Sequence, residues 1–80
     1  MEEDDEGEGQ GQGRLTVIVN GEARVIPAGT TVVGLLESME LGPKWVVVER
    51  NGEPVEKRDM ATTVLTDGDR LELVKAVAGG

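Results

Sequence analysis

The sequence predicts an α+β domain in which one helix packs across one face of a mixed sheet of four or five strands. Three observations predict it: two Asn-Gly pairs that each follow a β-prone run, one short apolar stripe of helical period, and an alternating run near the C-terminus. A chain of 80 residues has room for one small domain.

The first predicted strand begins at Arg14 and ends at an Asn-Gly pair. Alternation along it places three apolar residues on one face: Leu15, Val17 and Val19. Asn20-Gly21 follows at once, and because both central residues of a type I′ turn need positive φ, this pair predicts a hairpin. The return strand is predicted over 22–26, before Pro27 and Gly29 break the pairing.

The next segment predicts one short amphipathic helix. Thr31 is the expected N-cap, since its hydroxyl can accept a hydrogen bond from a free backbone N–H of the first turn. The apolar stripe has a period of 3.6 and consists of Val32, Leu35, Leu36 and Met39. Gly42-Pro43 is predicted to end the helix. Gly34 is a weak point in it and is expected to mark close packing of the helix on the sheet.

The run from Trp45 to Arg50 is the most β-prone of the chain, and its three consecutive valines are expected to be buried on both faces. A second pair, Asn51-Gly52, predicts a second turn, and Pro54 makes the strand after it, near 53–57, short and peripheral. Trp45 is interpreted as partly buried at the strand entrance, with an interface hot spot as the alternative.

Residues 58–66 have no clean period and are interpreted as a connecting loop or single turn, anchored to the core by Met60 and Leu65. Asp67-Gly68-Asp69 predicts a turn, and the final strand is predicted over 70–74 with Leu71 and Leu73 inward. First and last strands are expected to pair as central neighbours. This is the β-grasp layout of ubiquitin-like proteins, with 14–75 as the domain and 76–80 as a flexible C-terminal arm.

The remaining N-terminal residues, 1–13, form an acidic Gly/Gln segment with six acidic residues and no basic one. With no apolar residue after Met1 it cannot bury anything, so we expect it to be a disordered tail. A net charge of -8 argues against nucleic acid as a partner. No apolar run is long enough for a membrane span or a signal peptide, so the cytoplasm is the expected location. The expected state is a monomer.

Chemistry performed by the chain alone is not expected. It has no Cys and no His, which excludes disulfides, thiolate metal sites, a cysteine nucleophile and an imidazole base. The chain ends on Gly79 and Gly80, which leaves the terminal carboxylate unhindered and lets the end enter a narrow channel. The C-terminal carboxylate of Gly80 is therefore the candidate reacting group.

The ordered features of residues 14–80 resemble the ThiS type of bacterial sulfur carrier, which supplies sulfur for the thiazole ring of thiamine. The resemblance rests on features in order and spacing: Asn20-Gly21, Pro27-x-Gly29, Thr31 before Leu35-Leu36, Val46-x-Val48-x-x-Asn51-Gly52, Asp67-Gly68-Asp69, and Gly79-Gly80. Two departures are the acidic extension and Met60, since the family often has a tryptophan in that region. Neither departure affects the expected chemistry.

The resemblance implies that Gly80 is the only residue chemically changed. A ubiquitin-activating-like adenylyltransferase would adenylate its carboxylate with ATP and Mg, and the chain itself would bind no cofactor or metal. Sulfur from a cysteine desulfurase or a rhodanese-like protein would then convert the adenylate to a thiocarboxylate, and thiazole synthase would consume it. Gly79, Ala78 and Val77 would thread into the partner.

Several alternatives stay open at this point. The segment Ala76 to Ala78 either adds as a strand to a partner or continues the sheet, and three charged residues of the last strand either contact the activating enzyme or are merely solvated: Arg70, Glu72 and Lys75. The same chemistry serves carriers for molybdopterin and for tRNA thiolation. A ubiquitin-like protein modifier shares the first step, and a non-covalent β-grasp adaptor needs none of it.

Overall fold

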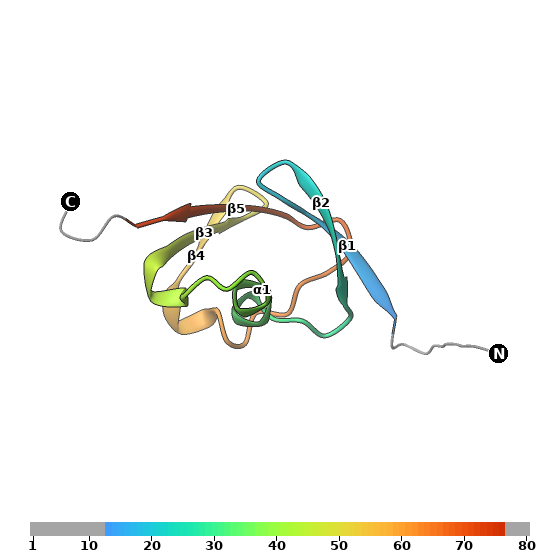
Figure 1. The fold of residues 1–80 in the computed structure, drawn as a ribbon, viewed down its shortest axis with the longest axis horizontal. Coiled ribbons are helices and arrows are strands. Elements are labelled where there is room, and N and C mark those ends of the chain that lie inside the picture. The colour runs from blue at the N-terminus through green and yellow to red at the C-terminus, as the bar shows by residue number, and fades with distance from the viewer. Residues whose placement is uncertain (1–12, 77–80) are drawn as a thin grey trace.

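The structure is a computed structural model that describes residues 13–76, and within them it has five strands and one α-helix (Figure 1). The elements are β1 (Arg14–Val19), β2 (Glu22–Pro27), α1 (Val32–Ser38), β3 (Val46–Arg50), β4 (Glu53–Val55) and β5 (Arg70–Lys75). The strands form one mixed sheet in the order β2-β1-β5-β3-β4, and α1 lies across one face of it. The predicted β-grasp fold is confirmed.

Both Asn-Gly pairs form the turns predicted for them. Asn20 and Gly21 have φ of 50° and 85°, and Asn51 and Gly52 have φ of 54° and 87°, so all four residues are in the left-handed region that a type I′ turn requires. β2 pairs antiparallel with β1, and β4 pairs antiparallel with β3 at the edge of the sheet. β4 stops at Val55, earlier than predicted, and a 3-10 turn at Lys57–Asp59 follows.

The helix begins as predicted and ends earlier. The Gly34 N–H donates to Thr31 Oγ1 at 3.0 Å, which confirms the N-cap. At the other end Leu41 N–H donates to the carbonyl of Leu36 at 2.9 Å while Glu40 has a φ of 60°. The helix therefore ends at Ser38 in a left-handed turn at Glu40. The prediction that Gly42-Pro43 ends it is wrong, because this pair instead starts a 3-10 turn at Pro43–Trp45.

Gly34 does not mark close packing of the helix on the sheet. A Cβ built on it would lie 3.4 Å from Thr30 Cγ2 and 3.4 Å from Thr31 Oγ1, which are atoms of the loop before the helix. That expectation from the sequence is wrong. The small residue instead leaves room beside the N-cap hydroxyl to which its own N–H is bonded.

The core lies between the helix and the inner face of the sheet. It consists of Val17, Val19, Ile26, Val32, Leu35, Leu36, Val46, Val48, Met60, Leu65, Leu71 and Leu73. Met60 and Leu65 confirm the predicted loop anchors. The expectation that β3 is buried on both faces is wrong: Val46 and Val48 are buried, but Val47 is 52 % exposed. In the described part of the chain nothing covers the outer face of the sheet, so alternation decides which valines are buried.

β5 lies in the centre of the sheet, as predicted. It runs parallel to β1 over the pairs Ile18 with Arg70 and Val19 with Leu71, and antiparallel to β3 from Leu71 to Lys75. β1 then leaves β5 at Asn20, whose side chain continues the pairing. Its Oδ1 accepts a hydrogen bond from Leu73 N–H at 2.8 Å, and its Nδ2 donates to the Leu73 carbonyl at 3.3 Å.

Replacing Asn20 by glycine tests this contact without disturbing the turn. Asn20→Gly keeps the positive φ but loses both hydrogen bonds to Leu73, so we expect the free energy of unfolding to fall by about 1–2 kcal/mol. Urea denaturation measures it. Asn20→Asp keeps an acceptor for Leu73 N–H and loses the donor, so its loss is expected to be smaller. Equal stability of all three proteins would contradict the role assigned to the side chain.

Candidate functional site

The residues that the sequence identifies as the reacting end lie outside the described part of the chain. These are Val77, Ala78, Gly79 and Gly80. Their roles stay predictions. The structure does describe the residues that lead to them, namely the end of β5 and Ala76.

The end of β5 is attached to the sheet mainly through β3. Lys75 pairs with Val46, and Ala76 N–H donates to the carbonyl of Trp45 at 2.6 Å, which continues the pairing beyond the strand. Along the opposite edge of β5, within residues 13–76, the Asn20 side chain at Leu73 is the last partner. The chain therefore passes Ala76 with one edge paired, in an extended direction away from the hairpin of β1 and β2 (Figure 1).

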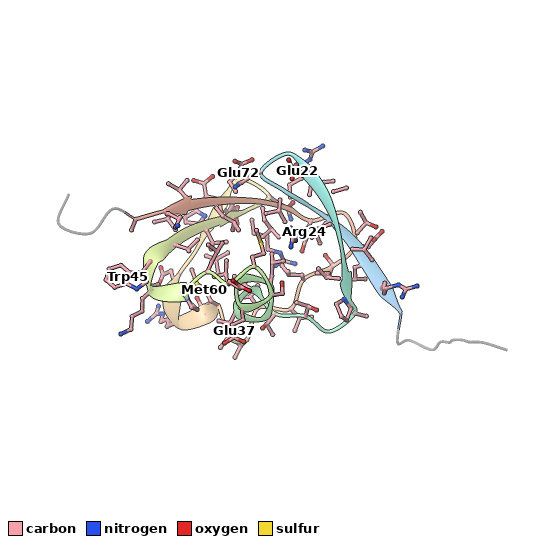
Figure 2. The ribbon with its side chains drawn as sticks, viewed as in Figure 1. Glu22, Arg24, Glu37, Trp45, Met60 and Glu72 are labelled. Atoms are coloured by element: carbon pink, nitrogen blue, oxygen red, sulfur yellow. The ribbon has the colours of Figure 1, made fainter. Side chains whose placement is uncertain are left out.

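Beside this point is a shallow hollow of about 370 Å³ between the loop after α1 and the end of β5. It is lined by Glu40, Leu41, Gly42, Trp45, Val46, Lys75 and Ala76. Trp45, interpreted from the sequence as partly buried at the strand entrance, is 54 % exposed and belongs to the 3-10 turn before β3. Figure 2 shows its ring at the end of the molecule where β5 terminates. A Cβ on Gly42 would lie 3.1 Å from Trp45 Cδ1, so glycine there leaves room for the indole.

The three charged residues of β5 that the sequence proposes as partner contacts are all exposed, but they do not share a face. Arg70 and Glu72 lie on the outer face of the sheet, opposite to the helix. Lys75 follows the parity of Leu71 and Leu73, so it lies on the inner side, beyond the end of the core. The expectation that all three alternate on the outward side is wrong for Lys75, since side chains alternate with a period of two.

The start of β5 is held by a buried carboxylate, that of Asp69, which is 5 % exposed. Arg50 Nε donates to its Oδ2 at 2.8 Å, and Asn51 Nδ2 donates to its Oδ1 at 3.0 Å. Thr66 adds two bonds, from its N–H to Oδ2 at 2.8 Å and from its hydroxyl to Oδ1 at 3.0 Å. Four donors therefore join the end of β3 to the loop before β5.

These contacts determine the ionisation of Asp69. Burial favours the neutral acid and by itself raises the pKa of Asp69, but hydrogen bonds from the Thr66 N–H, Asn51, Arg50 and the Thr66 hydroxyl lower it by more. The net effect is a pKa below the ordinary value of an aspartate. Asp69 is therefore a carboxylate at neutral pH that stabilises the junction.

Sequence reasoning missed this junction and the roles of both turn asparagines. Asn51 Oδ1 accepts a hydrogen bond from Arg70 N–H at 2.9 Å, as Asn20 Oδ1 does from Leu73 N–H. Each turn asparagine therefore holds the backbone of β5. The sequence offers one weak signal, the use of Asn in both turns where Asp or Gly satisfies the backbone equally well.

Residues 13–76 contain no group of three or more His, Cys, Asp or Glu residues arranged to hold a metal ion. The helix found among them is too short to cross a membrane. What the described residues present at the end of β5 is an anchored strand, a half-exposed tryptophan and the start of a five-residue C-terminal segment ending in two glycines.

A family model described as the ThiS family matches residues 17–80, from β1 to the terminal glycines. The chain belongs to the ThiS family. The family consists of small carrier proteins of thiamine biosynthesis rather than catalysts. The match includes Gly79 and Gly80.

Two solved structures are similar to this ThiS-family chain. A crystal structure of a thiamine biosynthesis protein (ThiS) from Geobacter metallireducens has a TM-score of 0.71 and 29% sequence identity, covering 82% of this chain and 100% of that one. A solution structure of a thiamine biosynthesis protein from the same organism has a TM-score of 0.67 at 29% identity and covers 82% of this chain and 88% of that one.

Two curated relatives are named thiazole synthase. One, from Paramagnetospirillum magneticum, is 39% identical over 66 residues, and one from Magnetococcus marinus is 36% identical over 66 residues. Each alignment covers 82% of this chain and 20% of the relative. The chain thus spans about a fifth of the length of these relatives, so in each the ThiS-like segment is one part of a much longer polypeptide.

Proposed function

We propose that this chain is a sulfur carrier for the thiazole of thiamine, with Gly80 as its reacting residue. The observation that carries the proposal is the ThiS-family match, which extends to Gly80 at the end of a segment that begins at the anchored residue Ala76. A domain without Cys or His has no thiol nucleophile and no imidazole base, and the Gly80 carboxylate is the only group of the chain assigned a chemical step, so we assign catalysis of each step to partner enzymes.

The proposed first step is adenylation by a ubiquitin-activating-like adenylyltransferase, which binds ATP and Mg. An oxygen of the Gly80 carboxylate attacks the α-phosphorus, the bond to the leaving phosphate breaks, and pyrophosphate departs. The product is an acyl-adenylate, in which AMP is a good leaving group. The domain contributes by holding the root of the segment in place, while the two glycines let the acyl group reach a buried active site.

The proposed second step replaces AMP by sulfur. A persulfide, formed by a cysteine desulfurase or a rhodanese-like protein, attacks the Gly80 carbonyl carbon through its terminal sulfur and AMP leaves. A partner thiol then cleaves the S–S bond of the acyl disulfide, which oxidises the two partner sulfurs to a disulfide and leaves the Gly80 thiocarboxylate. Both the ATP and the reduced thiols are found in the cytoplasm, where we place the protein.

The names of the two curated relatives support thiazole synthase as the sulfur acceptor. In both, a segment similar to this chain belongs to a polypeptide named thiazole synthase. When a sulfur carrier and the enzyme that accepts its sulfur are parts of one polypeptide, the effective concentration of the carrier at that enzyme is raised. The same observation favours the thiazole pathway over molybdopterin synthesis or tRNA thiolation.

Intact-mass spectrometry tests the proposal. The chain is produced together with a candidate adenylyltransferase, a cysteine desulfurase and a sulfur source, and its mass is compared with that from a reaction lacking ATP. We expect a gain equal to the replacement of one oxygen by sulfur, localised to Gly80 by fragmentation. Isopeptide-linked adducts on other proteins would identify a modifier instead. If the adenylyltransferase is active on its own carrier but the mass of this chain does not change, the chain is a non-covalent adaptor instead.

A further inference from the structure

The outer face of the sheet exposes two apolar side chains beside each other. Val47 of β3 and Val74 of β5 are register partners and are 52 % and 61 % exposed. Directly opposite side chains on neighbouring strands are in contact distance. They therefore form one small apolar area on the side of the sheet away from α1.

The next pair on the same face consists of two carboxylates. Glu49 of β3 is the register partner of Glu72 of β5, and both are exposed. The ion pairs among residues 13–76 join Arg50 to Asp69 and Arg58 to Glu56, so neither of the two carboxylates has a cationic partner there. Figure 2 shows Glu72 on the outer side of the sheet, with Glu37 on the opposite side of the molecule. Like charges directly opposite each other destabilise a sheet.

We propose that these four residues, the β3–β5 patch (Val47, Glu49, Glu72 and Val74), are the docking surface for the partner that adenylates Gly80. The valines contact an apolar side chain of that partner, and an Arg or Lys of the partner lies between the two carboxylates. A guanidinium supplies several donors in one plane and suits this pair best. The inference rests on the proposed function and adds the surface by which the partner recognises the domain.

The position of the patch along β5 supports this occupant. Glu72, Val74 and Ala76 follow one another on the same face, so the patch leads directly to the root of the C-terminal segment. Residues 77–80 span at most about 14 Å when fully extended. An active site that reaches Gly80 must therefore lie close to Ala76, and a partner placed there is beside the β3–β5 patch.

The charges of Glu49 and Glu72 also favour a cationic partner. Ten acidic and eight basic residues lie within 14–80, so the charges of this part of the sequence are nearly balanced. Two facing carboxylates with no cationic partner among the described residues are then a local feature rather than a consequence of overall acidity. A cationic partner turns their repulsion in the free chain into attraction in the complex, which favours association and makes it sensitive to salt.

Steady-state ATP–pyrophosphate exchange with the adenylyltransferase tests the patch. Val47→Thr/Val74→Thr and Glu49→Gln/Glu72→Gln are each expected to raise the KM for the carrier about tenfold with kcat within about twofold, since docking rather than chemistry is affected. The charge variant is also expected to lose most of the salt dependence of kcat/KM. The matched controls are Val25→Thr, an exposed valine on β2, and Glu37→Gln on α1; both should behave as wild type.

The free domain gives a second readout that does not need the partner. Glu72→Lys removes the like-charge pair and is expected to raise Tm by about 2–4 °C while it weakens docking further. If Glu72 served only the stability of the fold, a variant that raises Tm would not raise the KM for the carrier. Unchanged KM values in both double variants, or no rise in Tm for Glu72→Lys, would overturn the patch. Absence of exchange with wild-type chain would instead overturn the proposed function, so the two failures are distinguishable.

Discussion

An alanine added after Gly80 is expected to lower pyrophosphate exchange and thiocarboxylate formation by at least about 100-fold. The addition moves the carboxylate by one residue, about 3.5 Å, and places a methyl group beside the acyl carbon. A displacement of that size takes the attacking oxygen out of line with the α-phosphorus. Deletion of Gly80 is expected to have the same effect, because it withdraws the carboxylate by the same length.

The same change should leave the fold untouched. The described core lies within residues 17–73, and the addition is beyond it, so the free energy of unfolding is expected to change by less than about 0.5 kcal/mol. Urea denaturation and exchange assays on one preparation separate the two effects. An alanine inserted between Gly11 and Gln12 lengthens the chain equally and serves as the control. Full exchange by the extended chain would exclude Gly80 as the adenylated residue.

Asp69→Asn is expected to lower the free energy of unfolding by about 2–4 kcal/mol at neutral pH. The carboxylate accepts four hydrogen bonds, one of them from the Arg50 guanidinium. An asparagine has one acceptor oxygen, and its NH₂ group faces donors. Part of the network is then unpaired in a buried place, and the cationic Arg50 loses its counter-charge.

The pH dependence of this loss follows from the lowered pKa of Asp69. Because the folded-state pKa is below the unfolded value of about 3.9, the ionised Asp69 stabilises the fold fully above that pH and loses its contribution as the pH falls further. The difference between wild type and Asp69→Asn is therefore expected to be largest near pH 7 and to shrink in acid below about pH 4. Urea midpoints measured across that range test it.

Asp59→Asn is the matched control, since Asp59 is exposed and its described hydrogen bonds use its backbone rather than its carboxylate. It should change stability by less than about 0.5 kcal/mol. In the Asp69→Asn background, Arg50→Gln removes the uncompensated charge and is expected to cost little more, which a double-mutant cycle records as coupling. Additive losses would show that Arg50 and Asp69 do not act together.

Local chemistry explains why most of the fold could be predicted. Asn-Gly after a β-prone run specifies a turn whatever surrounds it, and Thr31 with a stripe of period 3.6 specifies where a helix starts and which side it buries. The errors occur where several local solutions compete. Gly42-Pro43 is a strong stop signal, but the helix has already ended at Ser38, and Glu40 takes the left-handed conformation after it although it is not a glycine.

By itself the sequence determined the elements and their order, and it predicted the candidate site, because Gly80 and the lack of Cys and His are properties of composition and position. Only the tertiary structure decided which side chains are buried and which distant residues are in contact. It buried Val46 and Val48 but exposed Val47, and it brought Asn20 to Leu73, 53 residues away along the chain. Such contacts depend on strand order and register, which arise when the sheet assembles, so no local pattern specifies them. The facing pair of Glu49 and Glu72 is of this kind and follows from the register of β3 with β5.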